Sequence, residues 1–446
     1  MTPTTLFTTE FDPTIDAGLQ GNYQTPGDKS ISHRALLLGA LAQGTTVIHG
    51  LLPAADIRST QQALQSLGVK LITRDHTTEV IGQGGWQFQP TAEAVSLDLG
   101  NSGTTTRLLL GLLARQRFTS HLQGDASLSQ RPLRDIIEPL SEMGAKFTTE
   151  TATLPLMIAP NQWLNGLRYR LPVASAQLKS ALILAALQAD QPSVFWELAP
   201  TRDHTERLLQ LFGAQVTATA GKIQVTPQRQ PLQAQELTIP GDPSSAAFMI
   251  CAALFRPHSR LTITNHSLNP TRTGLLRLLQ ALGAPITILP SSQTKTVEPA
   301  ADLLVETWTQ PTGTIQIDQH NLGGVIDEVP LLALLATQLP GTSVITDAAT
   351  LRHKETDRLA VITEQLRLFG ARIDENPTGL VIHGGHALHA PTVATLNSHG
   401  DHRIAMTLVI AELLLQAKVP IAGLDSIAIS NPTFLQDLVR ALGGPA

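Results

Sequence analysis

The sequence predicts an α/β protein of two domains, each built from three βαβαββ repeat units. Three observations support this fold class: one helix ending recurs six times, one polar helix start recurs six times, and short strand-like segments separate the helices. The chain has 446 residues, a length at which about two or three domains are expected. Apolar residues make up 42% and charged residues 15%, which predicts folded domains with buried cores.

The recurring helix ending consists of an apolar tail, a glycine and a small residue. Glycine suits the position just after a helix, because the left-handed backbone conformation found there carries no penalty for a residue without a Cβ. A strand is predicted after it, as at residues 69–72. The six glycines, spaced almost evenly along the chain, are Gly68, Gly144, Gly213, Gly283, Gly370 and Gly443.

The recurring helix start is a polar turn followed by a helix rich in alanine and leucine. These helices are apolar nearly all round, so they are expected to be buried. A short strand lies between them and the next helix, as at residues 46–48 and 261–264. Two domains of three repeats would join near residues 240–242 and in a flexible stretch at 21–27, forming a two-strand hinge. The six starts are at Gly27, Asn101, Ala174, Gly241, Ile326 and His399.

The helix starts also gather the charges expected of an anion-binding site. A helix N-terminus presents unpaired N–H groups and the positive end of the helix dipole. The chain has 31 basic and 36 acidic residues, a net charge of −5, so positive charge would have to be local. We expect a cleft between the domains that takes small anions with several charges. The sixth repeat has Asn431, Pro432 and Thr433 at the start of its second helix and no cation; in the first five repeats the cations near the second helix are Arg58, Arg131, Arg134, Arg202, Arg272, Arg352, Lys354 and Arg358.

Each of these residues alone also has a purely structural interpretation. Ser30, Thr104 and Ser244 could be helix N-caps, and His33 and His402 could be core residues. Asp327 and Glu328 could simply favour a helix dipole. It is their coincidence with the six repeats that favours a functional site.

Eight segments resemble one known family. They are GDKSISHRALLLGAL, LGNSGTTTRLL, RPL, SAQLKSALI, GDPSSAAF, NPTRTG, RHKETDRL and GDHRIAM, and they follow one another from about Gly27 to Phe434. The chain resembles the 5-enolpyruvylshikimate-3-phosphate synthase family (3-phosphoshikimate 1-carboxyvinyltransferase), in particular the second of its two bacterial classes.

The resemblance implies a more specific fold and a reaction. It implies two inside-out α/β domains, each of three βαβαββ units related by pseudo-threefold symmetry, comprising residues 1–22 with 241–446 and residues 23–240. The active site would lie in the cleft between them. The family transfers the enolpyruvyl group of phosphoenolpyruvate to the 5-hydroxyl of 3-phosphoshikimate, without a metal or an organic cofactor. The resemblance also implies a monomeric enzyme in the cytoplasm, with no nucleic-acid or membrane partner.

Site residues carry over from the matching motifs. Asp327 would be the general base, Glu355 would exchange a proton with the methylene carbon, and Lys29 would share the proton transfers. The residues implied to bind 3-phosphoshikimate are Lys29, Ser30, Arg34, Ser175, Ala176, Gln177, Arg202, Asp327 and Lys354. Those implied to bind phosphoenolpyruvate are Lys29, Gly103, Arg131, Gln177, Arg358 and Arg403. Glyphosate occupies the phosphoenolpyruvate site in this family; Gly103 favours sensitivity to it, whereas Leu108 and the resemblance to the second class favour resistance.

Some positions depart from the first class of the family. Residues 430–432 occupy the place of a segment that carries a lysine in members of the first class. Thr350 occupies a position where that class often has asparagine, and Leu108 a position where it has proline. None of these changes removes a proton-transfer group implied by the resemblance.

Two other functions were weighed. The sister enzyme that acts on UDP-N-acetylglucosamine carries a loop cysteine, whereas residues 124–128 contain none and the single Cys251 belongs to an apolar helix. A DNA-encircling clamp would need many cations on its inner surface, which a net charge of −5 opposes. The single cysteine excludes an internal disulfide framework, no apolar run is long enough to span a membrane, and the first residues do not resemble a signal peptide.

Overall fold

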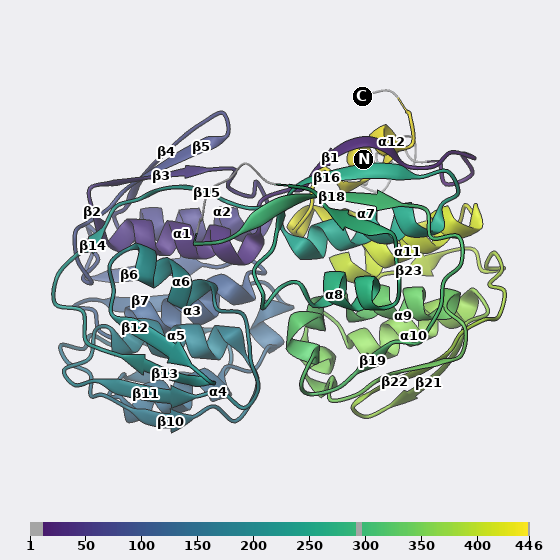
Figure 1. Ribbon diagram of the computed structural model, residues 1–446. Coiled ribbons are helices and arrows are strands. Elements are labelled where there is room, and N and C mark those ends of the chain that lie inside the picture. The colour runs from purple at the N-terminus through teal and green to yellow at the C-terminus, as the bar shows by residue number, and fades with distance from the viewer. Residues whose placement is uncertain (1–11, 291–296, 445–446) are drawn as a thin grey trace. The chain divides into compact units, whose positions relative to one another are not determined.

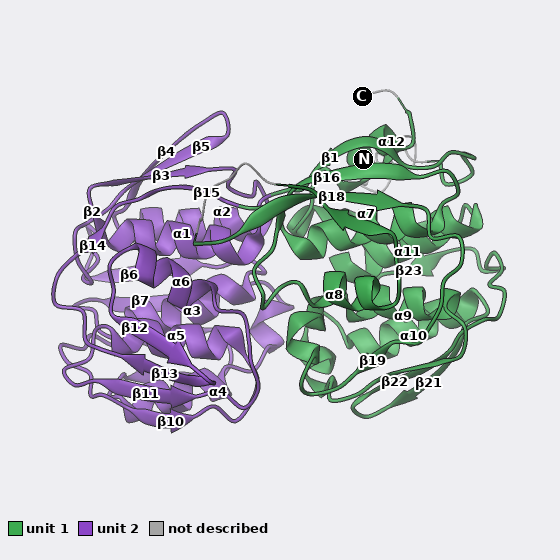
Figure 2. Ribbon diagram, in the orientation of Figure 1, with its two compact units in different colours: residues 1–26, 240–446 green, residues 27–239 purple. Residues whose placement is uncertain are grey.

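The computed structural model describes residues 12–290 and 297–444 and divides the chain into two compact units (Figure 2). Unit 1 comprises residues 1–26 and 240–446, and unit 2 comprises residues 27–239. The chain therefore passes between the units twice, after Pro26 and after Ile239. From the sequence, these passages were expected after residues 22 and 240.

Six amphipathic helices end in the predicted way. In each, the glycine after the C-cap has a positive φ, between 83° and 107°. The glycine N–H and the next N–H donate back to carbonyls of the last turn, as Gly68 does to Gln65 and Val69 to Leu64. The prediction of left-handed glycines is confirmed at all six positions. The helices are α2 (Ala55–Ser66), α4 (Arg134–Glu142), α6 (His204–Leu211), α8 (Gly274–Ala281), α10 (Arg358–Leu368) and α12 (Phe434–Ala441).

The six apolar helices are buried, also as predicted. In α7, every residue from Pro243 to Leu254 is buried, including Cys251. Within unit 2, α3 packs against α1 and α5, and within unit 1, α11 packs against α7 and α9. In each unit the sheets lie outside these central helices, which is the inside-out arrangement (Figure 1). The helices are α1 (Lys29–Leu41), α3 (Gly103–Leu113), α5 (Ala176–Ala186), α7 (Pro243–Phe255), α9 (Val329–Gln338) and α11 (His402–Leu415).

The second, third and fifth repeats each form a four-stranded sheet from their own segment of chain. In each sheet the first two strands are parallel and the last two complete it in antiparallel fashion. The second sheet has the order β6 (Ala94–Asp98), β7 (Thr119–Gln123), β9 (Leu156–Ile158), β8 (Phe147–Thr148). The third is β10 (Arg168–Arg170), β11 (Ser193–Trp196), β13 (Lys222–Val225), β12 (Val216–Thr219). The fifth is β19 (Gln316–Ile317), β20 (Thr342–Ile345), β22 (Gly379–His383), β21 (Arg372–Asn376).

The first and fourth sheets borrow their first strand from a distant part of the chain. In the first, β15 (Glu236–Thr238) runs parallel to β3 (Thr45–His49), followed by β5 (Thr77–Ile81) and β4 (Lys70–Arg74). In the fourth, β1 (Gln20–Gln24) runs parallel to β16 (Arg260–Ser267), followed by β18 (Ala300–Glu306) and β17 (Ile286–Ile288). Each borrowed strand completes the sheet of the first repeat in its unit.

This pairing corrects one expectation from the sequence. The sequence predicts a flexible stretch that includes residues 21–24, but in the structure these residues belong to β1 and pair in register with residues 261–264. Ladder hydrogen bonds hold this segment in the sheet, so the passage between the units begins only after it.

The sixth repeat is shorter than the others. In it, β23 (Leu396–Asn397) pairs in parallel with β24 (Ile421–Ala422), and α12 follows. Among the residues that the structure describes, the sixth repeat has this two-stranded pair in place of a four-stranded sheet. A further short pair, β2 (Ala42–Gln43) with β14 (Leu232–Gln233), lies in unit 2.

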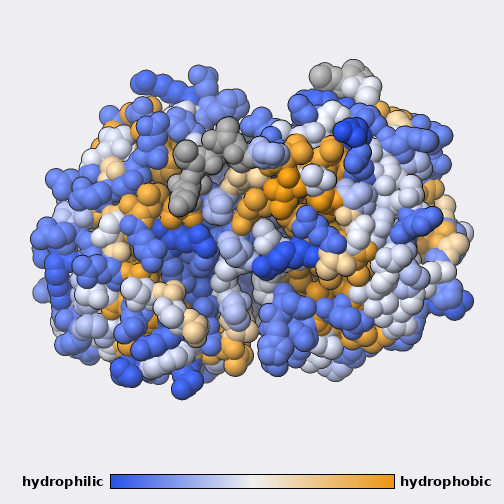
Figure 3. Space-filling model, in the orientation of Figure 1, coloured by the Kyte–Doolittle hydropathy of each residue, from blue (hydrophilic) through white to orange (hydrophobic). Residues whose placement is uncertain are grey.

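The surface of each unit differs from its interior. On the face shown in Figure 3, hydrophilic residues predominate in both units and are interrupted by smaller apolar areas. Within residues 12–290 and 297–444, no helix is both long enough and apolar enough to cross a membrane.

Candidate active site

The acidic and basic residues of unit 1 meet at the starts of three helices. Asp327 lies in a short 3-10 helix, η4 (Ile326–Glu328), which leads directly into α9. Glu355 lies in the turn before α10, and Arg358 is the first residue of that helix. Arg403 is the second residue of α11, whose N-cap is Asp401. The Asp401 carboxylate accepts the Arg403 backbone N–H at 2.9 Å, which fixes the start of α11.

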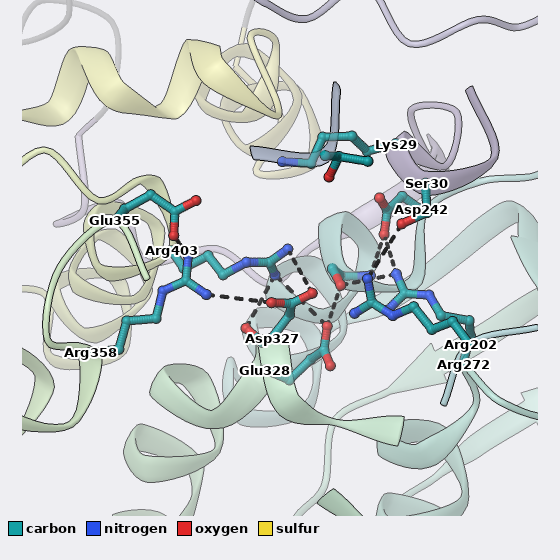
Figure 4. Close-up of polar contacts among 12 residues, drawn as sticks. Lys29, Ser30, Arg202, Asp242, Arg272, Asp327, Glu328, Glu355, Arg358 and Arg403 are labelled. Atoms are coloured by element: carbon teal, nitrogen blue, oxygen red, sulfur yellow. Dashed lines mark hydrogen bonds and ion pairs between the residues drawn. The ribbon is translucent and has the colours of Figure 1, made fainter. Parts of the chain in front are cut away.

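Arg358 connects the carboxylates of Asp401, Glu355 and Asp327; its contacts with Glu355 and Asp327 are drawn in Figure 4. Its side chain is 2% exposed. Nε donates to Asp401 Oδ2 at 2.8 Å, and Nη2 donates to Glu355 Oε2 at 2.6 Å. Nη1 lies 3.4 Å from Asp327 Oδ1. One guanidinium therefore holds the two carboxylates implied to act in proton transfer, and a third carboxylate holds the guanidinium.

The charges of Arg358 and Asp401 stabilise each other. Burial by itself lowers the pKa of Arg358, but Asp401, Glu355 and Asp327 together raise it above its ordinary value. Burial likewise raises the pKa of the Asp401 carboxyl, but the Arg358 guanidinium outweighs this and holds that pKa below its ordinary value. Both groups are therefore ionised at neutral pH.

Arg403 approaches the same site from α11. Its Nη1 donates to the backbone carbonyl of Asp327 at 3.2 Å, and its Nη2 lies 3.7 Å from Asp327 Oδ2. Nη1 also lies 3.9 Å from Glu328 Oε1. Glu328 in turn accepts a short hydrogen bond from the Ser244 hydroxyl. Arg403 thus touches the carboxylate and the backbone of the proposed base.

A further ion pair stands at the start of α7. Arg272 Nη2 donates to Asp242 Oδ1 at 2.8 Å and to the Ser244 hydroxyl at 3.1 Å. Both side chains of the ion pair are at most 8% exposed. Through Ser244 and Glu328, this pair is connected to the group around Arg403.

In unit 2, the implied substrate-binding residues also gather at helix starts. Lys29 is the first residue of α1, and its Nζ lies 3.1 Å from Asp56 Oδ2. Arg34 donates from Nη1 to the Ser30 carbonyl at 2.8 Å. Arg202 Nη1 donates to the Ser30 hydroxyl at 3.4 Å. Ser30 is therefore in contact with two cations, with Arg34 at its backbone carbonyl and with Arg202 at its hydroxyl.

Two further helix starts in unit 2 carry the remaining residues. Ser175 is the N-cap of α5, and Ala176 is its first residue. Gln177 Nε2 donates to the Thr104 hydroxyl of α3 at 2.9 Å. Gly103 is the first residue of α3.

Gly103 and Arg131 lie against each other. A Cβ on Gly103 would lie 3.1 Å from Arg131 Nη1 and 3.2 Å from Arg107 Nη1. Arg131 Nη2 also donates to Asn101 Oδ1 at 2.6 Å. The absence of a side chain at Gly103 thus lets two guanidinium groups come close to the backbone at the start of α3.

The expected N-caps need correction. The caps of α1, α3 and α7 are Asp28, Ser102 and Asp242, each two residues before the serine or threonine considered from the sequence. Their side-chain oxygens accept backbone N–H groups of the first turn. Ser30, Thr104 and Ser244 are therefore released from capping, and their hydroxyls take part in the contacts described above.

The cations of the second helices are not equivalent. Arg134 is 73% exposed and pairs with Glu138 one turn further along α4. Arg352 pairs with Asp357 and Glu375, and Arg58 donates to the Pro53 carbonyl. These three arginine side chains contact other residues than the groups described above do. Lys354 follows the short helix η5 (Ala349–His353) and is half-buried.

Two residues important to these groups were missed in the sequence, Asp401 beside Arg358 and Asp56 beside Lys29. Glu328 was considered only for a helix dipole, and the structure makes it a partner of Arg403. Asp401 stands in a Gly-Asp pair before a helix, as Asp28 and Asp242 do. That recurring pair was the available signal for an N-cap. No local pattern identified Asp56 or the role of Glu328.

Comparison with known proteins places the chain in a family. The family model for EPSP synthase (3-phosphoshikimate 1-carboxyvinyltransferase) matches residues 13–438. A 3-phosphoshikimate 1-carboxyvinyltransferase of Lactiplantibacillus plantarum is 48% identical over 429 residues, covering 96% of this chain and 98% of the relative. One of Leuconostoc mesenteroides is 45% identical over 423 residues, covering 94% and 96%.

Solved structures agree with this assignment. An EPSP synthase structure from Acinetobacter baumannii is similar with a TM-score of 0.82 at 35% identity, covering 96% of this chain and 97% of that one. The enolpyruvyl transferase NikO from Streptomyces tendae shares the fold, with a TM-score of 0.76 at 17% identity. The chain belongs to the EPSP synthase (3-phosphoshikimate 1-carboxyvinyltransferase) family.

Proposed function

We propose that the group around Arg358 carries out the proton transfers of the family's reaction. As an EPSP synthase, the enzyme transfers the enolpyruvyl group of phosphoenolpyruvate to the 5-hydroxyl of 3-phosphoshikimate and releases inorganic phosphate. The reaction belongs to the shikimate pathway of aromatic amino acid biosynthesis. It proceeds by addition and then elimination, through a tetrahedral intermediate.

The addition step needs one proton removed and one proton supplied. Asp327 removes the proton of the 5-hydroxyl of 3-phosphoshikimate while the oxygen of that hydroxyl bonds to C2 of phosphoenolpyruvate. Glu355 delivers a proton to the methylene carbon. In the elimination step, the Glu355 carboxylate takes a proton back from the resulting methyl group, the carbon–carbon double bond forms again, and the C2–phosphate bond breaks to release inorganic phosphate. Lys29 shares in these transfers. Positioned carboxylates of this kind contribute roughly 10²–10⁴-fold to a rate.

The observation that carries this proposal is the bridge between Asp327 and Glu355. Arg358 Nη1 lies 3.4 Å from Asp327 Oδ1, while its Nη2 lies 2.6 Å from Glu355 Oε2. A guanidinium between two carboxylates reduces the repulsion that would otherwise separate them. It therefore allows the carboxylates of Asp327 and Glu355 to stand close together at one site.

The substrates' anionic groups are assigned to the cations and helix starts. Arginine suits both phosphate and carboxylate, because its planar fork can donate two hydrogen bonds. Those assigned to 3-phosphoshikimate are Lys29, Ser30, Arg34, Ser175, Ala176, Gln177, Arg202, Asp327 and Lys354. Those assigned to phosphoenolpyruvate are Lys29, Gly103, Arg131, Gln177, Arg358 and Arg403.

The names of the relatives do not support the two alternative functions. The full-length relatives carry the name 3-phosphoshikimate 1-carboxyvinyltransferase, not that of the enzyme acting on UDP-N-acetylglucosamine. No relative named above is a DNA clamp. We further propose that the enzyme works as a monomer in the cytoplasm without a nucleic-acid or membrane partner, since both substrates are small, highly charged molecules that do not cross membranes unaided.

Separating the two carboxylates tests the proposal. Asp327→Asn keeps the shape of the side chain but cannot accept the hydroxyl proton, and Glu355→Gln keeps the shape but cannot exchange a proton with the methylene carbon. Both should lose roughly 10²–10⁴-fold in kcat, measured as phosphate release. Glu355→Gln should most strongly suppress solvent deuterium incorporation into the methylene group of phosphoenolpyruvate, followed by NMR.

A matched control is Glu375→Gln, which removes an ion pair of 2.8 Å with Arg352. It should leave turnover and exchange near wild-type values. If folded Glu355→Gln protein showed wild-type turnover and exchange, Glu355 would have no part in the proton transfers.

A further inference from the structure

A buried cation of unit 2 binds two carboxylates that none of the proposed functions uses. Lys179, in α5, has a side chain that is 1% exposed. Its Nζ lies 2.7 Å from Glu206 Oε1 in α6 and 3.0 Å from Glu197 Oε1. Both carboxylates are themselves at most 10% exposed. We call Lys179, Glu197 and Glu206 the Lys179 cluster.

The cluster closes the loop that precedes Arg202. Glu197 Oε1 accepts both the backbone N–H of Thr201 at 3.1 Å and its hydroxyl at 2.5 Å. Lys179 Nζ also donates to the Thr201 carbonyl at 3.4 Å. The backbone and the side chain of Thr201 are therefore both held by the cluster. Arg202 is the next residue, and its Nη1 reaches the Ser30 hydroxyl.

The neighbours of the cluster residues hold the other arginine of this region. Ser180 follows Lys179 in α5, and Thr205 precedes Glu206 in α6. Arg34 Nη2 donates to the Ser180 hydroxyl at 2.8 Å, and Arg34 Nε donates to the Thr205 hydroxyl at 2.6 Å. Adjacent residues of the same two helices thus support Arg34 directly and the loop of Arg202 indirectly.

Burying three charges is a poor means of stabilising a fold by itself. Removing charged groups from water costs several kcal/mol for each, and an apolar cluster of the same volume is often at least as stable. Here one ammonium serves two carboxylates, and Glu206 Oε2 has no hydrogen-bond partner among the described residues. What charged contacts of fixed geometry do supply is a single position for the loop that they hold.

We propose that Lys179, Glu197 and Glu206 are positioning residues that hold Arg202 in place for an anionic group of 3-phosphoshikimate. The inference rests on the proposed function, in which Arg202 and Ser30 bind that substrate. The cluster touches no substrate itself and acts through the backbone of Thr201. Preorganised cations bind an anion more tightly than mobile ones, because less order has to be imposed on binding.

Binding of 3-phosphoshikimate to the complete enzyme without phosphoenolpyruvate, measured by titration calorimetry, tests this inference. Glu197→Gln keeps an oxygen that can accept from Thr201 but removes the ion pair with Lys179. It should raise the Kd for 3-phosphoshikimate roughly tenfold. Asp190→Asn, which removes the partially exposed ion pair with Arg115, is the matched control in unit 2 and should leave Kd unchanged.

A double-mutant cycle with Arg202→Ala distinguishes positioning from stability. If the cluster acts through Arg202, adding Glu197→Gln to Arg202→Ala should weaken binding no further. A purely structural cluster would lower Tm and leave Kd unchanged, which would overturn the inference. An equal tenfold loss with and without Arg202 would overturn it too.

The outcomes also separate this inference from the proposed function. If Arg202→Ala weakened binding while Glu197→Gln did not, the binding site would stand and the positioning role would be rejected. If Arg202→Ala left Kd unchanged, the assignment of Arg202 to the substrate would be wrong, and the positioning role would be rejected with it. Should Glu197→Gln fail to fold, Thr201→Val removes only the hydroxyl bond to Glu197 and should raise Kd in the same direction.

Discussion

Replacing Asp401 with asparagine should lower both the stability of unit 1 and the affinity for phosphoenolpyruvate. Asp401 is fully buried. It accepts from Arg358 Nε at 2.8 Å, from Arg358 Nη2 at 3.4 Å and from the Thr356 hydroxyl at 3.2 Å. Asparagine can still accept the Arg403 N–H and cap α11, but its amide nitrogen then faces the Arg358 guanidinium. The substitution thus removes the charge and sets donor against donor.

The size of the effect follows from these contacts. Removing one partner of a buried ion pair costs about 3–5 kcal/mol, and Arg358 keeps Glu355 and Asp327, so we expect a loss near the lower limit, about 3 kcal/mol. For a domain of this size, about 2–4 °C in Tm accompanies each kcal/mol, which predicts a decrease of about 6–12 °C. Arg358 should also shift toward its remaining carboxylates, so the KM for phosphoenolpyruvate should rise.

The pH dependence of this loss has a definite sign. The pKa of Asp401 in the folded protein lies below the ordinary value of 3.8. Its carboxylate therefore contributes stability above about pH 4, and that contribution disappears as the pH falls through the lower folded-state pKa. The difference in unfolding free energy between the wild type and Asp401→Asn should be complete at neutral pH and should shrink in strong acid.

Calorimetry and steady-state kinetics on Asp401→Asn, with Asp357→Asn as control, decide the matter. Asp357 is also a helix N-cap paired with an arginine, at 2.7 Å from Arg352, but its side chain is 37% exposed. Its loss should cost less than about 1 kcal/mol. If both variants lost equal stability, or if Asp401→Asn kept the wild-type Tm and KM, the argument that Asp401 stabilises Arg358 would be refuted.

Three further predictions follow from single contacts. Lys29→Ala should leave the protein folded but lower kcat/KM, because the substitution removes a charged contact at a helix start that contributes on the order of 2–4 kcal/mol of transition-state stabilisation. A near-normal kcat/KM in a steady-state assay would reject the role of Lys29. Gly103→Ala should raise the KM for phosphoenolpyruvate and spare the affinity for 3-phosphoshikimate, because the new methyl would lie 3.1 Å from Arg131 Nη1 and displace it; an unchanged KM would show that the site adapts. Burial raises the pKa of Glu412, whose carboxylate accepts the Val419 N–H, to about 7 from 4.5. As the pH rises, the Glu412 carboxyl therefore loses its proton at a lower pH in the unfolded chain than in the folded protein. The free energy of unfolding should fall by on the order of 2–3 kcal/mol between about pH 4.5 and 7. Urea unfolding of Glu412→Gln should lack that decrease.

The local architecture of this protein can be predicted from its amino-acid sequence. The six glycines that end helices are recognisable because a left-handed residue after a helix strongly favours glycine, whatever lies around it. Helices such as α7 are recognisable as buried because they offer no polar face to water. The motifs that carry the family resemblance lie at the starts of these helices, and so the reaction could be predicted along with the fold. Each of these features depends on a short segment of the chain, so the sequence of that segment is enough to predict it.

Contacts between residues far apart in the chain cannot be predicted in this way, because they depend on the complete fold. Nothing in residues 236–238 or 20–24 shows that they complete the sheets of β3 and β16, because strand pairing depends on free edges supplied by other parts of the chain. The serines at helix starts were free for other contacts only because an aspartate or serine two residues earlier takes the cap. Asp401 and Arg358 lie 43 residues apart, and Lys179 and Glu206 belong to different helices. A buried charge is stabilised by whichever partner packing brings within about 3 Å, and that choice is made by the fold as a whole.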